Sequence, residues 1–127
     1  MDKLLAMQTK INRQINYPGK LSLHTNKGKE FFLPEQILRL EAKSNYTRIY
    51  FTNRFSIVTA KVLKDFEPLL MPCGFVRTHR SHLVNKHYIR QVCNNGTILM
   101  NDSSIAEISK RRKTAVLKAL QILTVRA

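Results

Sequence analysis

The side chains best suited to chemistry lie in one short stretch, FVRTHRSHLVN at residues 75–85. This stretch holds two arginines, two histidines and one asparagine. An arginine presents a planar fork of hydrogen-bond donors, an asparagine presents donors and an acceptor, and a neutral histidine presents one of each. Such groups bind phosphate oxygens and the edges of bases. Because residues 68–101 contain no Asp or Glu, the sequence predicts that a bound partner, rather than a nearby acid, neutralises these arginines.

The net charge of the chain favours the same kind of partner. The 127 residues include 22 Lys and Arg against 8 Asp and Glu, which gives a formal net charge of +14. A charge of this size says little about the fold, but it favours association with polyanions. Nucleic acid is the first candidate, an anionic membrane surface is the second, and an acidic protein is the third.

The residue types and their spacing argue against catalysis and against a metal site. Metal-dependent phosphoryl chemistry needs nearby carboxylates, and residues 68–101 have none. The spacing of His79, His82 and His87, three and then five residues, matches no zinc site closely. Cys73 and Cys93 lie outside any CxxC motif and fit structural thiols in a reducing compartment. We therefore expect no enzyme activity, no metal and no cofactor.

No segment of the sequence is suited to crossing a membrane. No run of 18 apolar residues is present, and the apolar stretch near the N-terminus is too short for a signal peptide. The sequence therefore predicts a cytoplasmic protein.

The elements that position the stretch 75–85 are predicted to be mostly short strands. Apolar residues at helical spacing predict a lead-in helix over residues 3–15, which Asn16–Gly19 ends. Beyond it, short β-rich runs separated by turn residues predict strands. The stretch 75–85 is expected to begin as a strand and then turn. The other expected strands are 20–25, 30–33, 37–42, 46–51, 55–59, 87–93, 97–100 and 104–108.

Two further helices are expected among these strands. The first covers residues 61–70, and we expect it to pack through one apolar face. That face consists of Val62, Leu63, Phe66, Leu69 and Leu70. The second covers residues 110–124 and is capped by Ser109. Its expected apolar face consists of Val116, Leu117, Leu120 and Leu123.

The first turn of this final helix carries four cations, KRRK at residues 110–113. The helix dipole and the free N–H groups at this end favour negative charge, so cations there are destabilising. Their presence predicts a phosphate in front of them, where N–H groups and side chains converge. An ordinary solvated basic turn is the alternative.

At three places the sequence resembles the LytTR-type DNA-binding domain, the output module of many bacterial response regulators. The resemblance rests on Ile37–Ala42 with Asn45 and Tyr46, on residues 75–85 with Ile89, and on Ile108 and Ser109 followed by basic residues. Order and spacing agree from about residue 20 to residue 123. We therefore interpret residues 1–19 as a lead-in helix or linker and residues 20–127 as a LytTR-like domain.

The resemblance implies an elongated, mainly β fold of small antiparallel sheets with short helices, one of them at the C-terminus. It also implies sequence-specific binding of double-stranded DNA by loops that reach two successive major grooves. An arginine at position 80 would suit guanine, whose O6 and N7 match its fork of donors. Carried over to this sequence, the DNA-binding residues are Asn45, Thr47 and Arg48, then Arg77, His79 and Arg80, then Lys110, Arg111 and Arg112.

Several of these residues also have a structural interpretation. Arg77 could bridge strands instead of facing DNA, and Asn45 could serve only its turn. Ser81 and Asn85 fit residues that fix a loop, because such side chains bond nearby backbone groups. RNA binding or non-specific nucleic-acid binding is the alternative function. RNA modules stack bases on exposed aromatic side chains, whereas the aromatic residues here lie mostly in expected strands.

Proteins with this domain usually begin with a receiver domain that carries the phosphorylated aspartate, and this chain has no receiver sequence. The chain is therefore either an excised output domain or a stand-alone regulator, and the lead-in favours the first. We expect a bacterial transcriptional regulator whose partners are repeated promoter sites in DNA, a receiver domain in the parent chain, and a second copy of the domain on DNA.

Overall fold

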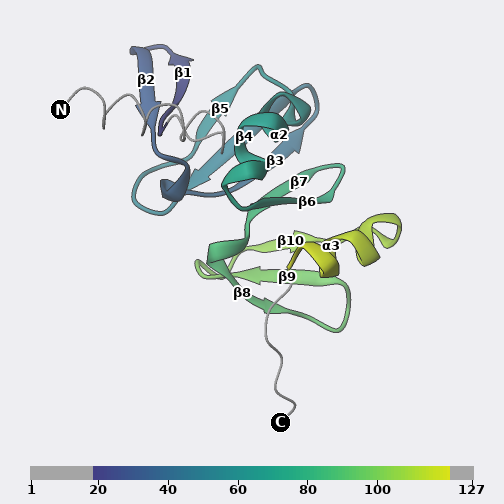
Figure 1. The fold of residues 1–127 in the computed structure, drawn as a ribbon. Helices are drawn as coiled ribbons and strands as arrows, with labels where there is room; N and C mark the ends of the chain where they lie inside the picture. The colour runs from purple at the N-terminus through teal and green to yellow at the C-terminus, as the bar shows by residue number, and fades with distance from the viewer. Residues whose placement is uncertain (1–18, 121–127) are drawn as a thin grey trace, which may run out of the picture.

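The computed structural model describes residues 19–120, and within them ten strands form three antiparallel sheets (Figure 1). The sheets follow one another along the molecule. A two-stranded sheet lies at the top of the view, a five-stranded sheet in the middle and a three-stranded sheet at the bottom. The predicted mainly β fold of small sheets with short helices is confirmed. The lead-in helix predicted over residues 3–15 lies outside the described residues.

The first sheet is the predicted hairpin. Strand β1 (Leu21–Thr25) pairs with β2 (Gly28–Phe32), so β2 begins two residues earlier than expected. Gly28 has a φ of +115°, a conformation that glycine adopts without steric cost. Alternation buries Leu21 and Leu23 on one face of β1, where they join the core of the central sheet.

The central sheet has the strand order β5-β4-β3-β7-β6. A 3-10 turn, η1 (Pro34–Gln36), leads into its first strand. The stretch 75–85 begins as a strand and then turns, as predicted, and it closes into a β6–β7 hairpin whose strand β7 pairs with β3 from far earlier in the chain. The strands are β3 (Ile37–Lys43), β4 (Tyr46–Phe51), β5 (Ile57–Thr59), β6 (Phe75–His79) and β7 (His82–Asn85).

Both faces of this central sheet are buried under separate hydrophobic clusters. Consecutive apolar residues of β3, β6 and β7 therefore enter different clusters, whereas β4 keeps the two-residue alternation of buried and half-buried side chains. The first cluster takes Ile37, Phe75 and Leu83, and the second takes Leu38, Val76 and Val84.

The single helix predicted over residues 61–70 is instead divided into three short pieces. They are η2 (Leu63–Phe66), α2 (Glu67–Leu70) and η3 (Met71–Cys73). Pro68 lies in the first turn of α2, where its missing N–H is tolerated, so the α-helix begins just before it. A 3-10 turn has three residues per turn, which aligns Leu63 with Phe66.

The predicted packing face of this segment is partly correct. Leu63, Phe66 and Leu70 are buried in the first cluster. Val62 and Leu69 are 49% and 47% exposed, so the expectation that they belong to the core is wrong. The change from 3-10 to α geometry prevents all five apolar residues from sharing one face.

The third sheet contains β8 (Ile89–Val92), β9 (Thr97–Met100) and β10 (Ile105–Glu107) in the order β10-β9-β8. A 3-10 turn, η4 (Lys86–Tyr88), precedes β8, so this strand begins two residues later than predicted. Ile98 and Met100 of β9 enter the second hydrophobic cluster. The predicted turn at residues 94–96 is present, and Gly96 has a φ of +84°.

The C-terminal helix begins with the predicted cap. The Ser109 hydroxyl accepts the N–H of Arg112 at 3.2 Å, and η5 (Lys110–Arg112) leads into α3 (Lys113–Ala119). Val116 and Leu120 join the second cluster, in which α3 packs against β6 together with residues of the third sheet. Leu117 is 47% exposed, which corrects its predicted place in the core, because adjacent residues lie about 100° apart around a helix. The predicted continuation through 121–124 lies outside the described residues.

Within residues 19–120, no helix has both the length and the apolar character needed to cross a bilayer.

Candidate nucleic-acid interface

Four segments that are distant in sequence meet at one end of the central sheet. The turn at residues 44–45 lies next to the turn at 80–81, because Ala42 N–H donates to the Ser81 carbonyl at 2.9 Å. Residues 59–61 join them through the pairing of β4 with β5. Residues 109–112 follow, since Ser109 N–H donates to the Thr78 carbonyl at 2.9 Å. We call these four segments the loop end; the β6–β7 turn and η5 both lie on the right in Figure 1.

The first segment of the loop end is the tight turn between β3 and β4. Ser44 has a φ of +56°, a conformation typical of tight turns, and Asn45 beside it is exposed. Arg48 is half-buried on β4, and its Nη1 donates to the Ser56 hydroxyl at 2.9 Å. Asn45 is therefore free to contact a ligand, whereas Arg48 is held against the neighbouring strand.

Thr47 lies inside the protein, whereas a side chain that contacts DNA must be exposed. Its side chain is buried, and its hydroxyl donates to the Lys61 carbonyl at 2.8 Å. The prediction that Thr47 contacts DNA is therefore not supported by its position. Its hydroxyl instead fastens the segment at 59–61 to the rest of the loop end.

Arg77 is engaged within the protein. Its guanidinium forms an ion pair with Glu67 and donates to the carbonyl oxygens of His79, at 2.9 Å, and Arg80, at 2.5 Å. The expectation that no residue of the chain neutralises the arginines of this stretch is therefore wrong for Arg77. Glu67 lies one residue before the acid-free segment and is brought to Arg77 by α2. The structural interpretation of Arg77 has geometric support, and a DNA contact by Arg77 stays a prediction.

Arg80 and His79 present donors at the tip of the hairpin. Arg80 is exposed, and within the described residues no acidic side chain pairs with it. The His79 Nδ1 atom accepts the Ser81 N–H at 3.0 Å, which fixes the orientation of the ring. Its Nε2 atom lies 3.7 Å from a carboxylate oxygen of Glu107. Turn geometry thus fixes His79, while the guanidinium of Arg80 stays available.

His82 lies beneath His79, with their ring centroids 5.5 Å apart. It is 6% exposed, and its Nδ1 atom has no hydrogen-bond partner among the described residues. Burial is the main cause that lowers the pKa of His82 below its usual value; Glu41 and Glu107 oppose this shift, whereas Arg39 and His79 add to it. His82 is therefore a neutral, packed side chain near neutral pH.

The third predicted site lies at the start of the C-terminal helix. Lys110 and Arg111 are exposed, and Arg112 is half-buried. The N–H of Arg112 is occupied by the Ser109 cap, so this N–H is not available to a phosphate, whereas the cationic side chains of Lys110 and Arg111 are exposed. The expectation that N–H groups converge on a phosphate here stays a prediction.

The structure also adds two charged residues that sequence reasoning missed. Lys61 is exposed, and the hydrogen bond from the Thr47 hydroxyl to its carbonyl holds it at the loop end. Glu107 has a side chain that is 63% exposed, next to His79. No motif marks either residue in the sequence, because each reaches the loop end through pairing with distant residues.

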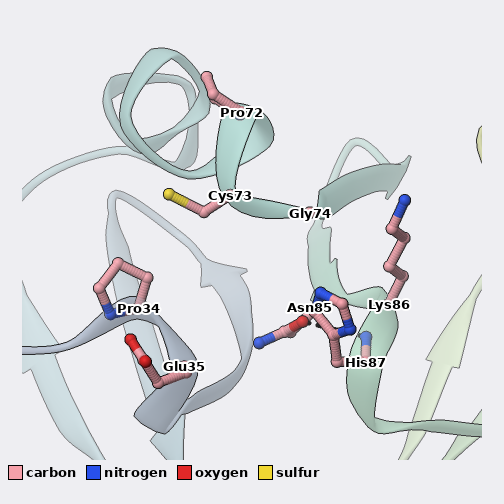
Figure 2. A pocket seen from close by; sticks show the side chains of 8 residues that line it. All are labelled: Pro34, Glu35, Pro72, Cys73, Gly74, Asn85, Lys86 and His87. Carbon is pink, nitrogen blue, oxygen red and sulfur yellow. Dashed lines mark hydrogen bonds between the residues drawn. The ribbon is translucent and has the colours of Figure 1, made fainter. Parts of the chain in front are cut away.

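A cavity of about 470 Å³ lies at the opposite end of the β6–β7 hairpin from the turn (Figure 2). Asn85 at its wall is buried, donates to the Ile37 carbonyl at 3.0 Å and accepts the His87 N–H at 3.0 Å, which confirms its predicted role in fixing the local backbone. Burial, and then Glu35, raises the pKa of the Cys73 thiol. A thiol in this state is a poor nucleophile at neutral pH, as expected for a structural cysteine.

A comparison with known protein families identifies the family of this chain. A family model described as the LytTr DNA-binding domain matches residues 27–121, which is most of the chain. The chain belongs to the LytTR family of DNA-binding domains. The predicted family and its DNA-binding activity are confirmed by this match, and the predicted contact residues stay predictions.

A solved structure supports the LytTR fold. It is the LytTr DNA-binding domain of a protein described as a methyl-accepting/DNA response regulator from Bacillus cereus, with a TM-score of 0.70 and 24% sequence identity. The similarity covers 82% of this chain and 98% of the solved one, and at this identity it supports the fold alone. A search of curated proteins found no match.

Proposed function

We propose that this LytTR domain binds a specific sequence in double-stranded DNA and that it does so through the loop end. The observation that carries this proposal is the convergence of the turn at 44–45, the turn at 80–81 and the segment at 109–112 on one side of the molecule. These are the loops that the family resemblance assigns to DNA. A rigid sheet holds all three, which preorganises their side chains for binding.

The exposure of the side chains suggests a division of labour. Lys61, Lys110 and Arg111 are exposed cations suited to phosphate oxygens, which fix the register of the protein on the duplex. Arg80 and Asn45 project from tight turns and are suited to base edges. Arg80 is assigned to guanine, and Asn45 can present a donor and an acceptor to adenine. His79 lies beside Arg80, with its ring held by the Ser81 N–H.

Duplex DNA fits this surface better than single-stranded RNA. RNA modules stack unpaired bases on exposed aromatic side chains. Phe31 and Phe55 are 59% and 92% exposed, but Phe55 lies in the connection between β4 and β5, at the opposite end of β4 from Asn45. Phe31 lies on β2 of the two-stranded sheet, so neither ring belongs to the loop end with its exposed cations.

We further propose that the domain serves as the output module of a bacterial two-component response regulator that acts in the cytoplasm. In this proposal a receiver domain in the parent chain controls the assembly of two copies on repeated promoter sites. The strong positive charge supports the DNA-binding step, because it steers the protein to a polyanion. The receiver partner rests on the usual organisation of the family.

Selection of duplexes from a random DNA pool at about 150 mM salt tests this proposal, because at that salt non-specific binding is weakened. We expect the wild-type chain to enrich a short motif. Arg80→Ala should relax the preference at one base pair, and Lys110→Ala should weaken binding to all sequences evenly. Binding of similar strength to duplex DNA and to RNA, with no enriched motif, would contradict sequence-specific readout.

A further inference from the structure

Glu107 is an acidic side chain in the middle of a cationic surface. It ends β10, two residues before the Ser109 N–H bonds the Thr78 carbonyl, so it lies between the β6–β7 turn and the segment at 109–112. The carboxylates of Glu41 and Glu67 at this side of the sheet are engaged with Arg39 and Arg77. The side chain of Glu107 is 63% exposed, and within residues 19–120 the only Lys, Arg or His nitrogen within 4 Å of its carboxylate belongs to His79.

The hydrogen bond between Ser81 and His79 determines which ring nitrogen of His79 carries its hydrogen. Its Nδ1 atom accepts the Ser81 N–H at 3.0 Å, so the ring hydrogen is assigned to Nε2. That Nε2 atom faces a carboxylate oxygen of Glu107 at 3.7 Å, which is longer than a hydrogen bond. The carboxylate therefore stands beside a fixed donor and keeps unsatisfied acceptor capacity.

The same residues could suggest a metal site. Ligand atoms of His79, His82 and Glu107 lie within 4.8 Å of one another, and the His82 Nδ1 atom has no partner. The His79 hydrogen bond opposes this interpretation. With Nδ1 occupied by the Ser81 N–H, the Nε2 atom of the neutral ring carries a hydrogen and has no lone pair for a metal. Binding a metal would require the turn at 80–81 to give up this bond.

We propose that Glu107 is a specificity-determining residue whose carboxylate accepts a hydrogen bond from the N4 amino group of a cytosine in the major groove. The inference rests on the proposed function, in which the loop end faces DNA. In this arrangement the His79 Nε2–H lies against the same carboxylate and helps to orient it. The cationic loop end attracts any DNA sequence, whereas the Glu107 carboxylate favours only a sequence that places a base amino group opposite it.

The chemistry of the base edges explains the choice of cytosine. In the major groove guanine presents two acceptors, and thymine presents an acceptor and a methyl group. A carboxylate has acceptors alone, so it is repelled by guanine and gains nothing from thymine. Adenine presents an amino group beside the acceptor N7, whereas cytosine presents its amino group without an adjacent acceptor. A negative charge placed among phosphates also weakens binding to every non-cognate sequence, which increases discrimination.

The test combines protein variants with changes in the DNA. The full chain would select a motif from random duplexes, and its affinity for that motif would be measured with each C·G pair replaced in turn by T·A. At one position we expect the wild type to lose about tenfold in affinity, as for one base contact. Glu107→Ala should lose less than about twofold from the same replacement, because the carboxylate contact is already absent.

Glu107→Gln gives a sharper outcome, because a glutamine amide can pair with both N6 and N7 of adenine. We expect its selected motif to change from cytosine to adenine at that position. Glu107→Ala should also bind scrambled duplexes a few-fold more tightly than the wild type, since it removes a negative charge from the interface. Glu35→Gln is the matched control, because Glu35 is exposed beside the cavity at the other end of the sheet.

The possible outcomes distinguish a failure of the proposed DNA-binding function from a failure of the proposed role of Glu107. A wild type that enriches no motif would overturn the proposed function and the role of Glu107 together. A wild-type motif that both Glu107 variants reproduce unchanged would overturn the role of Glu107 alone. Loss of the same base preference in His79→Ala and Glu107→Gln, without a change to adenine, would make Glu107 a residue that only positions His79. Affinity that rises with Zn²⁺ and falls with a chelator would make the cluster a metal site.

Discussion

Arg77 forms an ion pair with Glu67, and the same guanidinium closes the turn after β6 by donating to the backbone of His79 and Arg80. The arginine at position 77 therefore holds the turn, while the arginine at position 80 is exposed at its tip. Two arginines only three residues apart thus have different surroundings. This difference leads to opposite expectations for their variants.

Arg77→Ala should reduce stability more than it reduces sequence preference. Its side chain is 13% exposed, and removing it leaves Glu67 and two carbonyl groups without their partner. Hydrogen bonds to charged groups contribute about 2 kcal/mol, so we expect the free energy of unfolding to fall by about that amount. Urea titration measures it. Arg80→Ala is the control and should change stability by less than about 0.5 kcal/mol. Equal stability losses in the two variants would contradict this distinction.

Thr47→Val should also act through stability. The substitution keeps the shape of the side chain but removes the hydroxyl that donates to the Lys61 carbonyl at 2.8 Å. We expect a loss of about 1 kcal/mol in the free energy of unfolding, because the part-buried hydrogen bond between the two segments is lost. Thr52→Val is the matched control, since its exposed hydroxyl makes only a 3.4 Å contact with the Gln36 carbonyl. A changed base preference with unchanged stability would instead restore Thr47 as a DNA contact.

DNA affinity should fall steeply with salt. If the loop end contacts six to ten phosphates, affinity should fall roughly a thousandfold or more between about 50 and 200 mM salt. Lys110→Ala should lower the slope of log affinity against log salt by about 1. Lys29→Ala, in the β1–β2 hairpin, removes the same charge away from the loop end and should leave the slope unchanged. Fluorescence anisotropy with a labelled duplex measures all three proteins.

Stability should decrease on mild acidification because of His82. Its pKa is lowered in the folded protein, mainly by burial, so below about pH 6.5 the unfolded chain binds a proton that the folded protein resists. This contribution is fully present above the unfolded pKa and is lost as the pH falls from it towards the folded pKa. His82→Phe should have a flatter stability profile between about pH 7.5 and pH 5. Parallel profiles of the two proteins, measured by urea unfolding, would argue against this assignment.

Local sequence patterns predicted the turns of this protein but not the contacts between distant segments. Turn residues and β-rich runs predicted the β3–β4 turn and the hairpin at residues 94–96, because turn preferences are local. The division of the segment 61–73 was missed, since an apolar pattern at helical spacing does not distinguish a continuous α-helix from alternating 3-10 and α turns. The acid-free stretch 68–101 suggested unpaired arginines, but Glu67 reaches Arg77 through the packing of α2.

Composition and short motifs were enough to predict a polyanionic partner, the mainly β fold and the family, because these features depend on residue content or on residues close together in the chain. Which of the polar residues are exposed depends instead on packing between segments that are far apart in the sequence. Thr47 and Arg77 are used internally, whereas Lys61 and Glu107 are delivered to the loop end by hydrogen bonds and strand pairings between distant segments. Residues that are neighbours in the sequence are enough to form a turn. Which side chains are exposed together at the loop end depends on the pairing of β3 with β7 and on the packing of the third sheet against the central one.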